Sequence, residues 1–240
     1  MFNIPEKYEV NQKLPINDLI PKALKPADKK KIKEILVNVT LTHQIVGEEM
    51  PSLINESVHV EAIQYFDFEV KDIKKATFMA NVYQAIIKSP CVIHIHDKKD
   101  EIYSFALKRL NQNDKNEIVI TDNVMSKVFP LFLPSREKME FLEEVDYCNI
   151  KNKITKNHFY YEMTVRAYLE LNSKIYAPTD CITKKPIWYS EEKVKKTFDL
   201  FKQLKALKEQ VVKENRANEK MRINQEIREI IEELDKFKEE

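Results

Sequence analysis

Apolar residues at alternating four- and three-residue intervals dominate the end of this chain. They are Leu200, Leu204, Leu207 and Val211 in one run, and Ile223, Ile227, Ile230, Leu234 and Phe237 in the next. This spacing is typical of the narrow apolar seam of a coiled coil. The runs do not share one phase, because steps of seven from Val211 arrive at the polar residues Asn218 and Gln225. We therefore predict two helices folded back as a hairpin, with the turn near residues 215–218.

Upstream of this tail, strand-like alternation and helical stripes follow one another, which predicts an α/β or α+β fold. Prolines at positions 5, 15 and 21 favour an extended or briefly helical arm over residues 1–25. The helices predicted next cover residues 26–37, 73–88, 135–145 and 158–176. The strands predicted cover residues 39–46, 58–70, 91–96, 101–110 and 117–121. We expect a mixed, mainly antiparallel sheet of about five strands with packed helices in a core domain at 26–186, followed by the helical tail at 187–240.

Composition narrows the function. The single glycine, Gly47, excludes a Walker A loop, a dinucleotide fingerprint and a kinase glycine loop, which all need several glycines near phosphate. A formal charge of +1 lacks the basic excess typical of nonspecific nucleic-acid binding. Three widely spaced cysteines fit reduced thiols, and no apolar run is long enough for a membrane span. We expect a cytoplasmic protein that does not contact a membrane.

Several segments together resemble one prokaryotic family. They are Phe2-Asn3-Ile4-Pro5 with Glu9-Val10-Asn11 and Leu14-Pro15, the strand from Glu61 to Glu69, the segment from Ser89-Pro90 to His96, Phe105-Ala106-Leu107-Lys108, and the charged tail with Asn224 and Glu226. The chain resembles the domain of unknown function 4391 family. The resemblance implies a genomic context beside helicases and DNA methyltransferases in restriction-like or phage-defence loci. It supplies no catalytic residues.

The sequence His94-Ile95-His96-Asp97 is a candidate metal site. In a strand, His94 and His96 point to the same side, so both imidazoles could bind one ion with help from Asp97. A third ligand would be needed, and His43, His59 and Cys91 are candidates that no spacing distinguishes. The alternative, which we favour at this point, places both histidines on the polar face of a hairpin without a metal.

Asp67, Glu69 and Lys71 are candidates for a nuclease site. Restriction-type nucleases combine an acid on one strand with Glu-x-Lys on the next, so that two carboxylates hold Mg²⁺. Here the Glu-x-Lys unit is present, but Asp67 is on the same strand and Glu61 is hardly better placed. A strand end entering solvent with mixed charges is the favoured interpretation, so no cofactor is expected unless the nuclease alternative holds.

Basic clusters near two helix starts are candidates for nucleic-acid contact. They comprise Lys29, Lys30, Lys31, Lys74 and Lys75. Tyr65, Phe66, Tyr103 and Phe105 lie on strands nearby and could stack single-stranded bases if exposed, although such aromatics are more often core residues.

These patterns favour a non-enzymatic accessory or scaffold subunit of a prokaryotic DNA-defence complex. Its partner would be a helicase or DNA methyltransferase, or a second copy of the chain bound through the tail. The partner-binding residues predicted are Leu200, Leu204, Leu207, Val211, Ile223, Ile227, Ile230 and Leu234. A Mg²⁺-dependent nuclease and a nucleic-acid-binding module are the alternatives.

Overall fold

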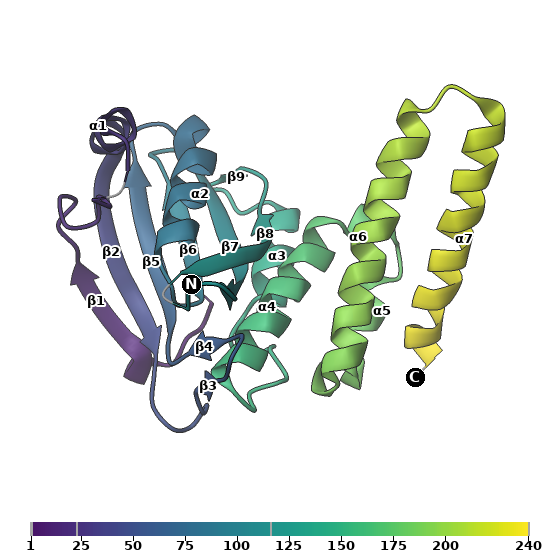
Figure 1. The fold of residues 1–240 in the computed structure, drawn as a ribbon, viewed down its shortest axis with the longest axis horizontal. Coiled ribbons are helices and arrows are strands. Elements are labelled where there is room, and N and C mark those ends of the chain that lie inside the picture. The colour runs from purple at the N-terminus through teal and green to yellow at the C-terminus, as the bar shows by residue number, and fades with distance from the viewer. Residues whose placement is uncertain (1, 23, 116, 240) are drawn as a thin grey trace. The chain divides into compact units, whose positions relative to one another are not determined.

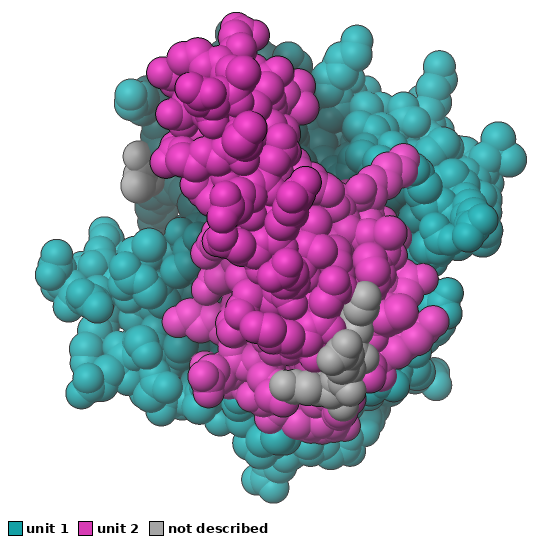
Figure 2. Space-filling view, turned by 90° about the vertical axis from the view of Figure 1, so that its right-hand side faces the viewer, with its two compact units in different colours: residues 1–164 teal, residues 165–240 magenta. Residues whose placement is uncertain are grey.

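The computed structural model describes residues 2–22, 24–115 and 117–239. The chain forms two compact units, residues 1–164 and 165–240, which are coloured separately in Figure 2. Helix α4 (Lys156–Leu171) contains the division between them. Each unit is described by itself below.

The elements of unit 1 alternate between strands and helices (Figure 1). The strands are β1 (Glu9–Lys13), β2 (Leu36–Ile45), β3 (Leu53–Ile54), β4 (His59–Val60), β5 (Ile63–Val70), β6 (Cys91–His96), β7 (Asp100–Leu110), β8 (Ile118–Met125) and β9 (Phe129–Pro130). The helices are α1 (Pro26–Ile35), α2 (Ala76–Ile86), α3 (Arg136–Glu144) and the first part of α4, with short 3₁₀ turns at Glu6–Tyr8 and Ile73–Lys75.

A seven-stranded sheet organises unit 1. Its order is β1-β2-β5-β6-β7-β8, with β9 pairing the start of β7. The pair β5–β6 is parallel and is connected through α2, whereas the other pairs in this sheet are antiparallel. The short strands β3 and β4 form a separate two-stranded ribbon.

The two faces of this sheet differ in chemistry. One face packs on α1 and α2 in an apolar cluster that includes Ile32, Phe68, Met79 and Ile93. The opposite face contains Tyr103, whose ring packs against Phe2 and against Phe141 of α3. Because side chains alternate along a strand, polar residues between apolar ones in β5, β6 and β7 point to this second face.

Local sequence signals explain where several helices begin. Pro26 occupies the first turn of α1, where its missing N–H costs nothing. The side chains of Asp72 and Ser135 accept hydrogen bonds from the backbone N–H groups of Lys74 and Lys138, and so cap the turns that follow. Ser190 caps α6 in the same way.

Unit 2 is helical. It contains the end of α4, α5 (Thr179–Thr183), α6 (Glu191–Lys213) and α7 (Ala217–Glu239), with 3₁₀ turns at Ser173–Ile175 and Pro186–Tyr189. Trp188 is buried, stacks on Arg166 and donates from its indole N–H to the carbonyl of Thr183. Tyr176 donates its hydroxyl hydrogen to Asp235 of α7 at 2.8 Å, so the connector before α6 belongs to the same core as the hairpin.

The mixed α+β class, the mainly antiparallel sheet and the C-terminal helical hairpin are confirmed. The sheet is larger than expected, because β1 and β9 join its edges and β8 runs on to Met125. The predicted strand at 58–70 is interrupted between β4 and β5. The compact units divide at 164/165, inside a helix, whereas composition indicated a boundary near Ile187. Proline-rich connectors mark irregular backbone, and the contacts of Arg166 and Tyr176 with later residues were not visible in that signal.

Candidate functional site

Register brings five polar side chains together on the second face of the sheet. In the parallel pair β5–β6, Asp67 lies opposite His94. In the antiparallel pair β6–β7, His94 lies opposite Tyr103 and His96 opposite Glu101. We call Asp67, His94, His96, Glu101 and Lys138 the polar cluster; the last of these comes from α3.

The histidine at position 94 is the centre of this cluster. Its Nδ1 lies 2.6 Å from Asp67 Oδ1, and its Nε2 lies 2.9 Å from Glu101 Oε2. The second histidine, His96, places Nε2 3.3 Å from Asp67 Oδ2 and Nδ1 3.2 Å from the carbonyl oxygen of Asp97. The two imidazole rings are stacked, with centroids 5.1 Å apart. Asp67 is therefore contacted by both histidines.

Glu101 is held from its other side. Its side chain is 2% exposed, and Oε1 lies 2.6 Å from Lys138 Nζ. Tyr103 donates its hydroxyl hydrogen to the same oxygen at 3.0 Å. Lys138 Nζ also donates to the carbonyls of Pro130 and Leu131, at 3.0 Å each. A buried lysine with three acceptors is fully hydrogen-bonded, so it fixes Glu101 firmly.

The electrostatics follow from these contacts. Burial by itself would raise the pKa of Asp67 and of Glu101, but hydrogen bonds from His94, joined by His96 or Lys138, outweigh it and keep both carboxyl pKa values below their ordinary range. Burial disfavours a charged His94, but Asp67 and Glu101 together raise its pKa. The hydrogen bond with Asp67 is the main reason that the pKa of His96 is raised. Without a metal, His94 is thus an imidazolium between two carboxylates.

An apolar cavity of about 90 Å³ reaches Asp67 and His94. Phe2, Ile4 and Val92 contribute to its wall. The side chain of Asp67 remains 32% exposed and that of His96 21%. The cluster is therefore buried at Glu101 and accessible at Asp67.

The sequence singled out Asp67, His94 and His96, but in two unrelated hypotheses. The structure unites them, and it corrects the interpretation of His94 as a residue on a polar hairpin face, because His94 is 6% exposed. Among the described residues, the proposed third metal ligands are not in this group. Cys91 lies in the apolar cluster of the other face, His59 is near Glu61 on the surface, and the Asp97 carboxylate caps its turn by accepting from backbone N–H groups.

Sequence reasoning missed Glu101 and Lys138. A signal was present for each. Glu101 is an acid beside the apolar run Ile102-Tyr103, and Lys138 lies three residues before Phe141 on the buried side of α3. An ionisable residue on an apolar face usually has a partner, but the identity of that partner depends on long-range contacts.

The nuclease trio does not form as a unit. Asp67 contacts histidines, and the register partners of Glu69 are Asn38 on β2 and His96 on β6 rather than a second acid. Lys71 is exposed just beyond the end of β5. Two carboxylates on adjacent strands, the requirement for the restriction-type Mg²⁺ site, are therefore not found here.

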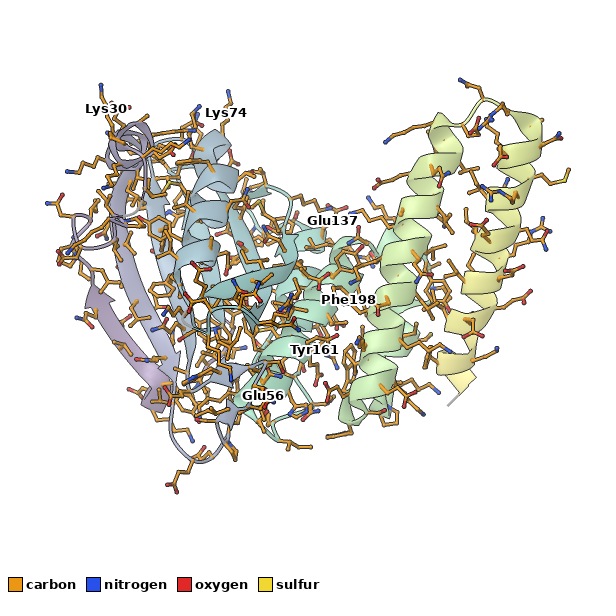
Figure 3. All side chains as sticks on the ribbon, viewed as in Figure 1. Lys30, Glu56, Lys74, Glu137, Tyr161 and Phe198 are labelled. Atoms are coloured by element: carbon orange, nitrogen blue, oxygen red, sulfur yellow. The ribbon has the colours of Figure 1, made fainter. Side chains whose placement is uncertain are left out.

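The basic residues lie on α1 and just before α2, and Figure 3 shows Lys30 and Lys74 at the same end of unit 1. Lys31 sits over the ring of Phe78 at 3.8 Å, and Lys29 donates to the carbonyl of Lys22 at 2.7 Å. Lys30, Lys74 and Lys75 are exposed. The aromatics Tyr65, Phe66, Tyr103 and Phe105 are buried, so they cannot stack bases.

The predicted partner-binding seam packs within the chain. Leu204, Ile223 and Leu234 are fully or almost fully buried as α6 and α7 pack against each other. Ile227 and Ile230 are 9% exposed, and Leu200, Leu207 and Val211 are partly exposed. An open groove of about 460 Å³ lies between the two helices, with Ala206, Leu207 and Ile230 among its lining residues.

A family model for a domain of unknown function, DUF4391, matches residues 2–234 of the 240 residues. The chain belongs to the DUF4391 family. The match includes both units, so the polar cluster and nearly all of the hairpin lie inside the family domain. Searches of curated proteins and of solved structures find no match to this DUF4391 chain. In the part of the chain that the structure describes, none of the helices combines the length and apolarity needed to cross a bilayer.

Proposed function

We propose that this protein is a non-enzymatic accessory subunit that docks a partner protein through the groove of its C-terminal hairpin. The observation that carries the proposal is the groove itself. Its lining residues Ala206, Leu207 and Ile230 remain at the surface edge of a hairpin whose own core is already filled. A preformed apolar groove offers binding without the entropic cost of ordering the helices.

Internal packing supports a rigid platform. Across the hairpin, Lys196 pairs with Glu233. Helix α6 contains seven basic and four acidic residues, whereas α7 contains seven acidic and five basic residues. These opposite charge balances favour the antiparallel pairing of α6 with α7 inside one chain, rather than pairing of two identical tails.

The charge at the groove selects the kind of occupant. Glu226, Glu229 and Glu233 all come from α7 and line the same groove as Leu207 and Ile230. An amphipathic helix fits such a surface when its apolar stripe meets the groove floor and its lysines or arginines meet the glutamates. We therefore propose a basic amphipathic helix of the partner as the occupant.

The family resemblance gives the context of this proposal. We propose that the partner is a helicase or DNA methyltransferase of a prokaryotic DNA-defence complex, and that assembly takes place in the cytoplasm. Steering by the acidic side of the hairpin would speed the encounter and make it sensitive to salt.

The test is co-purification of the protein with a co-expressed candidate partner, followed by a titration of the purified pair. The variant Glu226→Lys plus Glu229→Lys reverses the charge at the groove. The control, Glu219→Lys plus Glu232→Lys, makes the same change of charge on α7 at residues that do not line the groove. We expect the groove variant to weaken binding at least tenfold and the control to weaken it less than threefold. Equal affinities of wild type and groove variant would refute docking at this groove.

Two other outcomes would replace the proposal. Mg²⁺-dependent cleavage of labelled DNA that Glu69→Gln abolishes would favour the nuclease. Salt-sensitive nucleic-acid binding that Lys30→Ala and Lys74→Ala weaken, without turnover, would favour a nucleic-acid-binding module.

A further inference from the structure

A second function is indicated by the polar cluster in unit 1, which is separate from the hairpin. Asp67, His94 and His96 offer one ligand atom each, and all three atoms lie within 4.8 Å of one another. We propose that these three residues bind one divalent transition-metal ion, such as Zn²⁺ or Fe²⁺.

The arrangement of the two imidazoles carries this proposal. Each ring uses its far nitrogen for an acceptor outside the group: His94 Nε2 lies 2.9 Å from Glu101, and His96 Nδ1 lies 3.2 Å from the carbonyl of Asp97. The remaining nitrogens, Nδ1 of His94 and Nε2 of His96, both face Asp67. In neutral imidazoles with those outer N–H groups, two lone pairs and a carboxylate converge on one position. A cation is needed at such a position.

This is the pattern that metal-binding histidines show in general. The ring nitrogen away from the ion donates to a carboxylate or a backbone carbonyl, which fixes the tautomer and the ring orientation. Here Glu101 is the carboxylate, and it is itself held by Lys138 at 2.6 Å and by Tyr103 at 3.0 Å. A surface histidine pair without a ligand does not need this buried outer layer.

Distances are compatible with an ion after a small adjustment. Tetrahedral Zn²⁺ with bonds near 2.0–2.1 Å holds its ligand atoms about 3.3 Å apart. His96 Nε2 and Asp67 Oδ2 are already 3.3 Å apart. His94 Nδ1 and Asp67 Oδ1 are 2.6 Å apart, a hydrogen-bond distance, so they must separate by about 0.7 Å. Rotation of the partly exposed Asp67 carboxyl group can supply this movement.

The ligand types select the class of ion. Two imidazole nitrogens with one carboxylate suit zinc or ferrous iron, whereas Mg²⁺ and Ca²⁺ prefer sites built from oxygens. Three protein ligands leave further positions open for water or for another small ligand. The adjacent cavity of about 90 Å³ has room for a few water molecules next to Asp67 and His94.

The competing occupant is a proton on His94, which makes the imidazolium described above. The two states differ in metal content, so direct measurement separates them. Tag-free protein would be stripped with a chelator, dialysed, and titrated with Co²⁺ and Zn²⁺. We expect one equivalent per chain by elemental analysis and a Co²⁺ absorption spectrum typical of nitrogen and oxygen ligands.

Variants at the accessible ligands keep the test independent of folding. His96→Gln and Asp67→Ala should each weaken binding at least tenfold, and Glu101→Gln should weaken it about tenfold to hundredfold by releasing His94. His59→Gln is the control for an exposed histidine. Cys148→Ser plus Cys181→Ser controls for binding by exposed thiols and should leave the affinity unchanged.

Absence of stoichiometric binding in the wild type would overturn the proposal. So would binding that persists undiminished in folded His96→Gln and Asp67→Ala proteins. These readouts concern unit 1, so they can fail while docking at the hairpin groove succeeds, and the reverse also holds.

Discussion

Replacing Lys138 by methionine should lower the free energy of unfolding of unit 1 by about 3 kcal/mol. The change removes the positive charge 2.6 Å from Glu101, whose side chain is 2% exposed. It also deprives the carbonyls of Pro130 and Leu131 of a donor.

The magnitude follows from what remains after the substitution. Breaking a buried ion pair by removal of one partner costs about 3–5 kcal/mol. The lower end applies here, because Glu101 keeps its contacts with His94 and Tyr103. With a urea dependence of about 2–3 kcal/mol per molar, the unfolding midpoint should fall by roughly 1 M.

The assay is urea-dependent labelling of Cys91. This thiol is buried in β6, the strand that contains both histidines, so a brief pulse of alkylating reagent modifies it when the sheet opens. Peptide mass spectrometry distinguishes Cys91 from the exposed Cys148 and Cys181.

A matched control and a second substitution make the result decisive. Lys127→Met removes a lysine from the exposed pair with Glu137 and should cost less than about 1 kcal/mol. Adding Glu101→Gln to Lys138→Met should recover part of the loss, because no unpaired buried charge then remains. If Lys138→Met moves the midpoint no more than Lys127→Met, the polar cluster is not held as we argue.

Two further predictions concern the hairpin and pH. Leu204→Ala should cost about 2–5 kcal/mol in unit 2, read by the fluorescence of Trp188, the single tryptophan; Val212→Ala, 81% exposed, is the control and should change stability by less than about 0.5 kcal/mol. In chelator, the raised pKa of His94 adds stability below an unfolded pKa of about 6.5 that is lost as pH rises through the folded pKa, and the lowered pKa of Asp67 adds stability above about 3.9 that is lost on acidification. The ion pair therefore contributes most between about pH 4 and 6.5, and Asp67→Asn should flatten this dependence in urea titrations; an unchanged profile would contradict the assignment.

Local patterns predicted the hairpin well. The change of seam phase between Val211 and Ile223 indicated a turn near 215–218, and α6 ends at Lys213 while α7 begins at Ala217. The strand at 91–96 was predicted with its observed bounds, because proline and polar residues flank a β-branched run. Such signals depend on neighbouring residues and can be read from one sequence.

The polar cluster could not be predicted in the same way. Asp67 meets His94 because β5 and β6 are parallel neighbours in a particular register, and that pairing depends on contacts far apart in sequence. Lys138 reaches Glu101 across 37 positions of the chain. The sequence showed which residues were unusual, but their partners depend on how the sheet and α3 pack.

The cysteines of this chain also provide a means of measurement. Cys91 is buried, whereas Cys148 and Cys181 are exposed and belong to different units. A donor dye and an acceptor dye attached to these two thiols would place one fluorophore on the sheet unit and one on the helical unit. Energy transfer between them would then report the separation of the two units, and its spread, in solution without any engineered attachment point.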